Sequence, residues 1–316
     1  MLATTNPTAY RGRFAPSPTG PLHFGSLVAA LASALEARAN RGQWLLRMED
    51  VDAPRCSKIA ADEILRTLEV FGFKWDGALV WQSRRTAAYA AALEQLRGGA
   101  DVFPCACTRR ELADAEIHGL AIDGASVYPG TCRNGLAPGK SARAWRLAVG
   151  DAQISFSDTI QGRINSLLSK DVGDFVLLRA DNIFAYQLAV VIDDAAAGIT
   201  HVVRGADLLH STARQIFLQQ KLALPTPEYA HVPVAVNAAG EKLSKQTGAT
   251  ALDTRNAATE LVAALQLLGQ SPPAELRRAS VAEIWQWASV HWALASVPRV
   301  MAQNSNRFET QHSEQT

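Results

Sequence analysis

The chain has 316 residues, 48% of them hydrophobic, and a formal net charge of +1 at pH 7. A chain of this length buries a substantial core and has room for one to three domains. A net charge so close to zero argues against strong nonspecific binding to RNA, so any RNA site is expected to be local. No apolar run is long enough to cross a bilayer, and the first residues lack the apolar core of a secretory signal. The chain is therefore expected to be cytoplasmic.

The first predicted elements are a strand-like start, a loop and a helix. The loop, RFAPSPTGPLHFGS at residues 13–26, is rich in proline and glycine and delivers a histidine to the start of an apolar-periodic segment. In that segment Leu27, Leu31 and Leu35 recur at four-residue spacing, which predicts a helix over about residues 26–40. Ser26 is its expected N-cap.

The next segment, WLLRMED at residues 44–50, is an apolar stretch short enough for a buried strand. Strand, loop, helix and strand in this order predict a right-handed βαβ unit. Nucleotides bind at the C-terminal ends of the strands in such units. A nucleotide site is therefore expected where the histidine loop meets the helix.

Cysteines in the middle of the chain form the next candidate site. Cys105 and Cys107 are separated by one residue, and Cys132 follows them. So close a pair favours metal binding in a reducing cytosol over a disulfide framework. The three thiols give three soft ligands, whereas tetrahedral zinc takes four. His118 is a candidate fourth ligand on chemistry alone, because imidazole binds zinc far more often than phenol does. Without further context, three thiols that bind no metal are an equally open alternative.

The second half of the chain alternates strands and helices again. FVLLRADN and FAYQLAVVIDDAAAGITHVVRG, at residues 175–182 and 184–205, predict strands and a helix, with β-branched residues at 190–192 and 201–203. The lysine-bearing segment EKLSKQ follows at residues 241–246. Two amphipathic segments, ATELVAALQLLG and VAEIWQWASVHWAL, are then expected to form helices, separated by a Ser-Pro-Pro break.

These segments together resemble the catalytic core of class I glutamyl-tRNA synthetases, and more narrowly the glutamyl-Q branch of that family. HFGS at residues 23–26 resembles the family's HIGH motif, with Ser26 in place of the second histidine, and KLSKQ at residues 242–246 resembles its KMSKS loop. The similarity spans roughly residues 11 to 250 and includes CACT at 105–108, YPGTC at 128–132, FAYQLAVVIDD at 184–194 and GITHVVRGADLLHSTARQ at 198–215.

The resemblance implies an α/β fold with a Rossmann-like doubly wound parallel sheet. The two halves of this sheet are expected at residues 1–100 and 166–250, the second with the KLSKQ loop. An inserted zinc-binding subdomain of the acceptor type is expected at 101–165, and a small C-terminal helical unit with a polar tail at 251–316. Conventional members carry further helical domains that read the anticodon, and no such module is expected in the residues printed after Lys245.

The implied reaction is the ATP-dependent activation of L-glutamate to glutamyl-adenylate. Such a site neutralises crowded phosphate charge and needs no covalent nucleophile. His23 can donate to phosphate oxygens ahead of a helix N-terminus, whose dipole adds to the attraction. ATP would bring Mg²⁺, held mainly through phosphates and water. The family's ATP-binding and catalytic positions correspond here to His23, Gly25, Ser26, Lys242, Ser244 and Lys245.

The resemblance also implies a glutamate pocket. Its positions correspond here to Arg13, Phe14, Ala15, Pro16, Ser17, Glu49, Tyr186 and Arg204. Arg13 and Arg204 would hold the side-chain carboxylate, since a guanidinium pairs with a carboxylate through two parallel hydrogen bonds. Ser17 and Glu49 would hold the α-amino group, and the hydroxyl of Tyr186 would close the pocket. From spacing alone, Glu49 could instead cap a helix and Tyr186 could be an ordinary core residue.

In the glutamyl-Q branch, a tyrosine four residues before the last cysteine completes a zinc site. The resemblance therefore implies one structural Zn²⁺ per chain, held by Cys105, Cys107, Tyr128 and Cys132, with His118 as the alternative to the tyrosine. The implied acceptor is queuosine at the wobble position of tRNA(Asp), with no membrane and no obligate protein partner. Two alternatives remain: a truncated glutamyl-tRNA synthetase that charges the 3′ end of tRNA, and a nonenzymatic RNA-binding paralogue.

Overall fold

The computed structural model describes residues 9–113, 127–237, 240 and 250–305. Its first unit consists of β1 (Arg11–Phe14), α1 (Phe24–Ala39) and β2 (Gln43–Met48). β1 and β2 pair in parallel, with Arg13 opposite Leu45. The predicted succession of strand, helix and parallel strand is therefore confirmed.

α1 begins two residues earlier than the sequence suggested. Its N-cap is His23, which has an extended backbone and whose Nδ1 accepts a hydrogen bond from the backbone N–H of Ser26 at 3.3 Å. The prediction of Ser26 as N-cap is wrong, because the imidazole satisfies the helix terminus that a serine was expected to satisfy. After the helix, the chain turns back at Gly42, where a Cβ would collide with the backbone oxygen of Tyr10.

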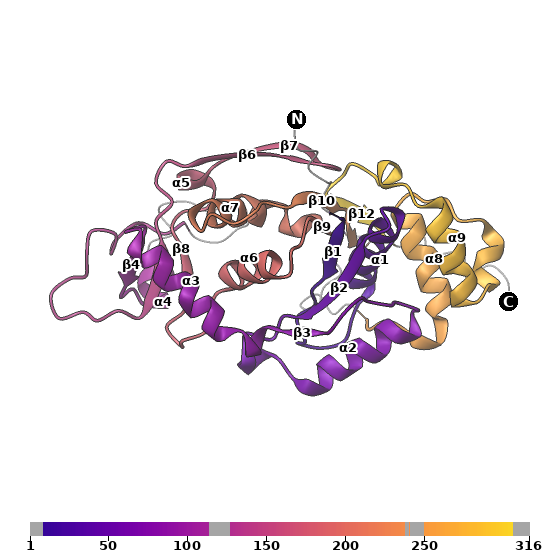
Figure 1. Ribbon diagram of the computed structural model, residues 1–316, viewed down its shortest axis with the longest axis horizontal. Helices are drawn as coiled ribbons and strands as arrows, with labels where there is room; N and C mark the ends of the chain where they lie inside the picture. Colours follow the sequence, from indigo (N-terminus) through magenta and orange to yellow (C-terminus); the bar gives the residue numbers. More distant parts are fainter. Residues whose placement is uncertain (1–8, 114–126, 238–239, 241–249, 306–316) are drawn as a thin grey trace, which may run out of the picture.

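Parallel strands form the centre of the molecule (Figure 1). β3 (Val80–Trp81) extends the first sheet in the order β1-β2-β3. A second sheet has the order β7-β6-β10-β9, in which β6, β10 and β9 are parallel and β7 is antiparallel. Its strands are β6 (Gln153–Asp158), β7 (Gly162–Leu167), β9 (His201–Gly205) and β10 (Glu228–Val232).

β1 lies beside β9, where the backbone N–H of Thr200 donates to the carbonyl oxygen of Arg11 at 2.9 Å. β1 therefore has the next strand in sequence, β2, on one side and a much later strand, β9, on the other. The strand order changes direction at this point. In open α/β sheets such a switch point is where ligands bind, at the carboxyl ends of the strands.

Helices pack around these strands in two hydrophobic cores. They are α2 (Lys58–Val70), α3 (Thr86–Gly98), α6 (Tyr186–Ala196), α7 (Leu209–Lys221), α8 (Ala257–Leu267) and α9 (Val281–His291). The first core includes Leu27, Leu31 and Leu35 of α1, each at most 1% exposed. The second core gathers residues of α3, α6 and α7. Residues 190–192 lie within α6, whereas 201–203 lie in β9, so only the latter run is a strand.

The two amphipathic segments near the C-terminus are helical, as predicted, and pack on the first core. α8 contacts α1, and α9 contacts α8. The indole N–H of Trp285 donates to the carbonyl oxygen of Phe71 at 2.8 Å, and that of Trp292 donates to Glu36 at 2.6 Å. These helices lie at one end of the elongated molecule (Figure 1).

A small antiparallel sheet lies at the opposite end of the molecule (Figure 1). It consists of β4 (Val102–Cys105), β5 (Ala144–Leu147) and β8 (Phe175–Leu178), in that order. The remaining elements are α4 (Arg109–Ala113), α5 (Leu168–Asp171), β11 (Val234–Val236) and β12 (Ala302–Asn304). The boundaries of the inserted and C-terminal units stay predictions. In the part of the chain described, no helix combines the length and apolar character needed to span a bilayer.

Candidate active site

A cleft of about 300 Å³ lies at the carboxyl ends of β1, β9 and β10, the switch point of the parallel strands. Every described residue that the sequence assigned to glutamate or ATP lines this cleft: Arg13, Phe14, Ala15, Pro16, Ser17, His23, Gly25, Ser26, Glu49, Tyr186 and Arg204. Segments far apart in the sequence thus meet in one place. Lys242, Ser244 and Lys245 lie outside the described residues.

The described residues on both sides of the lysine segment lie close to the cleft. Before it, Ala235 of β11 lines the cleft. After it, Ala251 forms an antiparallel bridge with His23, and the backbone N–H of Leu252 donates to the carbonyl oxygen of Leu22 at 3.0 Å. The chain therefore leaves the cleft and returns to it on either side of the segment that carries the lysines.

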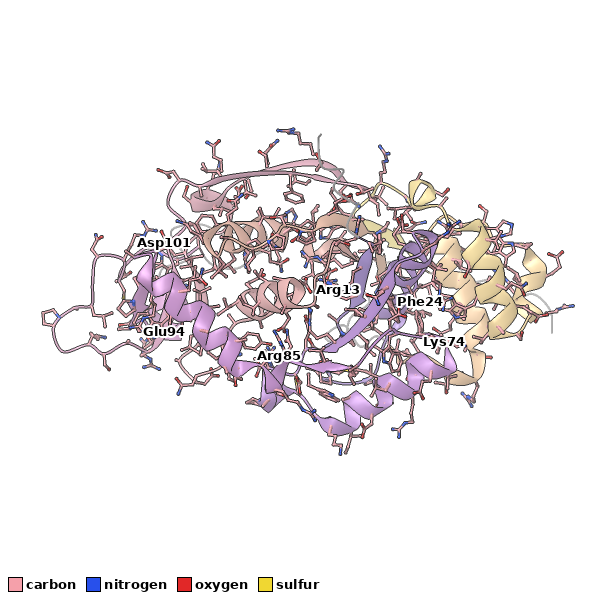
Figure 2. The ribbon with its side chains drawn as sticks, viewed as in Figure 1. Arg13, Phe24, Lys74, Arg85, Glu94 and Asp101 are labelled. Carbon is pink, nitrogen blue, oxygen red and sulfur yellow. The ribbon has the colours of Figure 1, made fainter. Side chains whose placement is uncertain are left out.

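Arg13 lies on the central strand β1 (Figure 2) and lines the cleft. A carboxylate holds its guanidinium group. Its Nε and Nη2 donate to Asp194 of α6 at 3.2 Å each. Arg47 of β2 donates to the same carboxylate at 2.6 Å. Burial raises the pKa of Asp194, but the two guanidinium groups outweigh it and hold the pKa below its ordinary value. Asp194 therefore stays ionised and orients both arginines.

Glu49 is the carboxylate that faces the cleft from the end of β2. It is 8% exposed, and its Oε1 accepts from Nη2 of Arg47 at 3.2 Å. Burial raises the pKa of Glu49, while Arg47 and Arg13 act in the opposite direction. Glu49 is therefore not simply a helix cap, because its carboxylate pairs with Arg47.

Arg204 reaches the cleft from β9 and is 5% exposed. Its Nε donates to Nε2 of His231 at 3.0 Å, and its Nη2 donates to Oγ1 of Thr212 at 2.9 Å. Its Nη1 is buried and has no hydrogen-bond partner within the described parts of the chain. Buried donors in proteins are nearly always satisfied, so this nitrogen is suited to an acceptor on a bound ligand.

Sequence reasoning missed several residues of this site. Arg47 was part of the predicted strand, and Asp194 ended a quoted motif, but neither was given a role. A signal was present, because Arg47 and Glu49 are two residues apart in a strand and so face the same side. His231 and Thr212 gave no such signal, since His231 reads as a single polar residue in an apolar segment and Thr212 as one of several polar residues in a helix.

His23 and Tyr186 complete the wall of the cleft with neutral polar groups. Because Nδ1 of His23 accepts the capping hydrogen bond, the neutral ring carries its proton on Nε2 and can donate from there. Burial, together with the charge of Glu49, raises the pKa of Tyr186 to about 12. The phenol is therefore protonated at neutral pH and can also donate a hydrogen bond.

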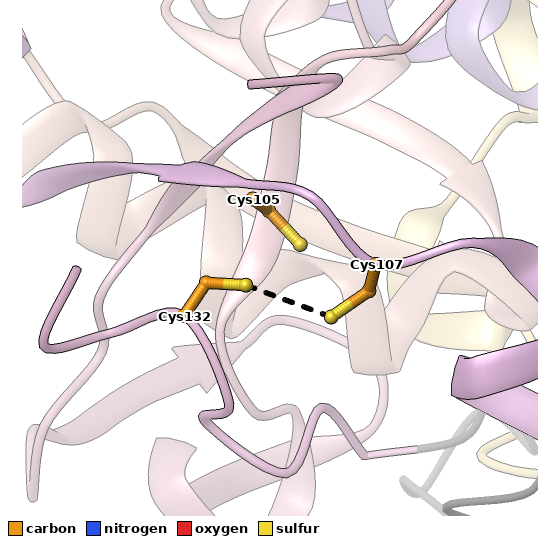
Figure 3. Close-up of side chains that lie close together, drawn as sticks. All are labelled: Cys105, Cys107 and Cys132. Carbon is orange, nitrogen blue, oxygen red and sulfur yellow. Dashed lines mark hydrogen bonds between the residues drawn. The ribbon is translucent and has the colours of Figure 1, made fainter. Parts of the chain in front are cut away.

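The cysteines predicted as metal ligands lie together at the end of β4 (Figure 3). The sulfur atoms of Cys105, Cys107 and Cys132 are all within 4.8 Å of one another, and those of Cys107 and Cys132 are 3.7 Å apart. Tetrahedral zinc with ordinary zinc–sulfur bonds separates its sulfur ligands by about 3.8 Å. The hydroxyl of Tyr128 lies 3.6 Å from Cys105 and 3.7 Å from Cys107. His118 lies outside the described residues.

The fold and the cleft define a class of protein, and comparison with known families agrees. The family described as tRNA synthetases class I (E and Q), catalytic domain, matches residues 9–298. The chain belongs to this family. Its mixed α/β architecture with a parallel sheet is that of the class I catalytic domain.

The names of individual relatives are more specific than the description of the family. The glutamyl-Q tRNA(Asp) synthetase of Aromatoleum aromaticum is 62% identical over 290 residues, which cover 92% of this chain and 91% of that protein. The protein of the same name from Dechloromonas aromatica is 60% identical over 290 residues, covering 92% of this chain and 96% of the relative. Among solved structures, glutamate-tRNA synthetase from Elizabethkingia anophelis superimposes with a TM-score of 0.78 at 25% identity, covering 97% of this chain and 71% of that one.

Proposed function

We propose that this chain is a ligase that activates L-glutamate with ATP and transfers the glutamate to queuosine at the wobble position of tRNA(Asp). The relatives that are 62% and 60% identical to it carry the name glutamyl-Q tRNA(Asp) synthetase. The observation that carries the proposal is the single cleft that joins Arg13, Glu49 and Arg204 to the histidine loop. An acidic amino acid and a nucleotide can meet there.

The cleft offers one group for each polar part of glutamate. Arg204, whose Nη1 has no partner among the described residues, and Arg13, whose Nη1 is not used by Asp194, would bind the side-chain carboxylate. Glu49, together with Ser17, would accept hydrogen bonds from the α-ammonium group. A buried guanidinium that loses its carboxylate is costly, which disfavours the neutral amide of glutamine. Tyr186 would donate its hydroxyl proton at the edge of the pocket.

ATP would bind next to the glutamate, over the N-terminus of α1. Nε2–H of His23 would donate to a phosphate oxygen, while Gly25 and Ser26 line the cleft at the first turn of the helix. The helix dipole favours the phosphate charge there. Lys245, with Lys242 and Ser244, would stabilise the leaving pyrophosphate, and Mg²⁺ would arrive with ATP. The pairing of Ala251 with His23 supports this arrangement, because the described chain that follows the lysine segment runs beside the histidine.

The reaction itself requires positioning and charge stabilisation only. The α-carboxylate of glutamate attacks the α-phosphate of ATP, and pyrophosphate leaves with the electron pair of the broken bond. A hydroxyl of the acceptor then attacks the carbonyl carbon of the mixed anhydride, and AMP leaves. Both steps use the same pocket, since the glutamate stays bound between them.

One Zn²⁺ would be held by Cys105, Cys107, Cys132 and Tyr128. The soft donor set and the spacing of the sulfur atoms suit tetrahedral zinc, and none of the three cysteines lines the cleft, as expected of a structural ion. All four cysteines of the chain are free thiols, which supports a cytoplasmic location. The unit at residues 101–165 would then be the zinc-bearing insertion.

The proposal is tested by transfer of labelled glutamate to tRNA(Asp) with and without queuosine. We expect label only on the queuosine-containing tRNA, and only in the ribonuclease fragment that contains the anticodon. Label in the fragment that carries the 3′ end would instead identify an enzyme that charges the terminal adenosine. Absence of glutamate-dependent ATP–pyrophosphate exchange by the zinc-replete protein would point to a nonenzymatic paralogue.

A further inference from the structure

A buried chain of hydrogen bonds extends from Arg204 away from the cleft, through three neighbouring strands. Nε of Arg204 in β9 donates to Nε2 of His231 in β10 at 3.0 Å. Nδ1 of His231 lies 2.6 Å from Oδ2 of Asp158 at the end of β6. The side chains of His231 and Asp158 are 0% exposed, so their interaction is fully buried, unlike that of a surface ion pair.

Asp158 is a fixed anchor. Its Oδ1 accepts from the backbone N–H groups of Ile160, Gln161 and His231, at distances of 3.0, 2.8 and 3.1 Å. Burial raises the pKa of Asp158, but its hydrogen bonds, that from His231 foremost, hold the pKa below the ordinary value. The carboxylate is therefore ionised and leaves Oδ2 as the acceptor that faces His231.

The partners of His231 define its tautomer. Because Oδ2 of Asp158 is an acceptor only, Nδ1 carries the proton, and the lone pair of Nε2 is left to accept from Arg204. Burial and the positive charge of Arg204 lower the pKa of His231 to about 4, although Asp158 acts in the opposite direction. The ring is thus neutral at neutral pH, as an acceptor beside a guanidinium must be.

Thr212 of α7 holds the other edge of the guanidinium. Its Oγ1 accepts from Nη2 of Arg204 at 2.9 Å, while the hydroxyl can donate to the carbonyl oxygen of Leu208 at 3.3 Å. With Nε and Nη2 engaged, the plane of the guanidinium is fixed. Nη1, which has no partner in the described parts of the chain, is left for a ligand. Arg204 therefore does not need to be ordered when a carboxylate arrives.

We propose that His231, anchored by Asp158, is a positioning residue that orients Arg204 for the side-chain carboxylate of the amino-acid substrate. His231 does not touch the substrate and takes no part in proton transfer. Its contribution is to hold the guanidinium in one orientation, which removes an ordering cost from binding. The inference rests on the proposed function of the cleft and adds a residue that determines specificity for an acidic substrate.

Two substitutions of His231 separate orientation from packing. In His231→Gln, the amide oxygen occupies the place of Nε2 and can still accept from Arg204. In His231→Asn, the amide nitrogen occupies the place of Nδ1 and can still donate to Asp158, but Nε of Arg204 loses its acceptor. Both variants replace the ring by an amide. Asparagine is one methylene shorter than glutamine and leaves the larger gap, so Thr212→Val is measured beside them as a substitution that keeps the shape of the side chain. His291→Asn, the same exchange at an exposed site on α9, is the control for the chemistry of the substitution.

The measurement is glutamate-dependent ATP–pyrophosphate exchange without tRNA. We expect His231→Asn to raise the KM for glutamate by about tenfold to a hundredfold, the range for a lost hydrogen bond to a charged group, and to leave the KM for ATP unchanged. His231→Gln should raise the KM for glutamate by no more than about threefold, and His291→Asn should not change it.

Equal effects of the two His231 substitutions on the KM for glutamate, or a parallel rise in the KM for ATP, would overturn the proposal. If His231→Asn does not fold, Thr212→Val tests the same point, because it removes the second acceptor and keeps the shape of the side chain. It should raise the KM for glutamate by about threefold to tenfold, and an unchanged KM would count against the proposal. Absence of exchange by the wild-type protein would instead refute the proposed function itself.

Discussion

At the scale of single residues, the cleft depends on charges that are buried together. Arg47 is 3% exposed and pairs with both Asp194 and Glu49. Burial lowers the pKa of Arg47, but these carboxylates more than compensate and raise it. The guanidinium of Arg47 thus holds in place both Asp194, which orients Arg13, and Glu49, which is expected to bind the α-ammonium group of glutamate.

Replacing Arg47 by methionine should destabilise the fold by about 3 to 5 kcal/mol, because two buried carboxylates lose a partner. The free energy of unfolding in urea measures this effect. Arg55→Met is the matched control: Arg55 also pairs with an aspartate, Asp52, but its side chain is 73% exposed. Its loss should cost less than about 1 kcal/mol. Equal losses in the two variants would contradict the role of burial.

The pKa of His231 also gives the stability a pH dependence. The pKa is lowered from 6.5 to about 4, so between these values the unfolded chain binds a proton that the native protein does not. Stability is therefore complete above pH 6.5 and decreases as the pH falls towards 4, by up to about 3 kcal/mol. Urea unfolding across this range should show the decrease. In His231→Gln, the free energy of unfolding should decrease less steeply with falling pH. An identical decrease would show that His231 is not its cause.

At the scale of elements, the end of β4 and the turn before Cys132 bring the thiols together. Cys105 and Cys132 are buried, and Cys107 is partly so. The backbone N–H of Cys132 donates to the hydroxyl of Tyr128 at 2.9 Å, which keeps the phenol facing the sulfur atoms. The two segments thus hold three sulfur atoms close enough together to be ligands of one tetrahedral ion.

The purified protein should contain one zinc ion per chain, and Cys132→Ser should reduce this content several-fold, because hydroxyl is a much poorer zinc ligand than thiolate. Elemental analysis after dialysis measures the change. Cys56→Ser is the control, since Cys56 is not part of the thiol cluster. A zinc-free wild-type protein, or equal zinc loss in both variants, would rule out the proposed site.

At the scale of the whole molecule, the cleft exists only where the two sheets meet. β1 contributes Arg13, α6 contributes Tyr186, and β9 contributes Arg204, so three distant segments must be packed before the pocket forms. The described residues on both sides of the lysine segment, Ala235 and Ala251, lie at the cleft and beside His23. Binding of the amino acid and handling of the triphosphate are thus assigned to different segments.

Lys245→Ala should therefore slow ATP–pyrophosphate exchange by about a hundredfold to a thousandfold, the usual effect of removing a group that stabilises transition-state charge. The dissociation constant for glutamate should stay unchanged, because the arginines proposed to bind it come from other segments of the chain. Calorimetric titration with glutamate measures the second quantity. Lys221→Ala, at a lysine that pairs with Asp101 on the surface, serves as control. Equal loss of exchange and glutamate binding would make Lys245 a structural residue.

The sequence by itself determined the elements and the class of site. The spacing of Leu27, Leu31 and Leu35 predicted α1, the apolar stretch before Glu49 predicted β2, and the histidine and lysine motifs indicated a nucleotide. Apolar periodicity and loop motifs are local properties, so they can be read from neighbouring residues. The N-cap was the exception. His23 and Ser26 lie only a few residues apart and both can cap a helix, so the sequence pattern did not decide between them.

Only the tertiary structure decided which buried polar groups meet. Asp194 orients Arg13, from which it is separated by 181 residues in the sequence. Asp158 acts on Arg204 through His231, and 73 residues separate Asp158 from His231. No periodicity marks such pairs. A buried charge is stable only next to its partner, and that partner is supplied by strand order and helix packing, which single-sequence patterns do not specify.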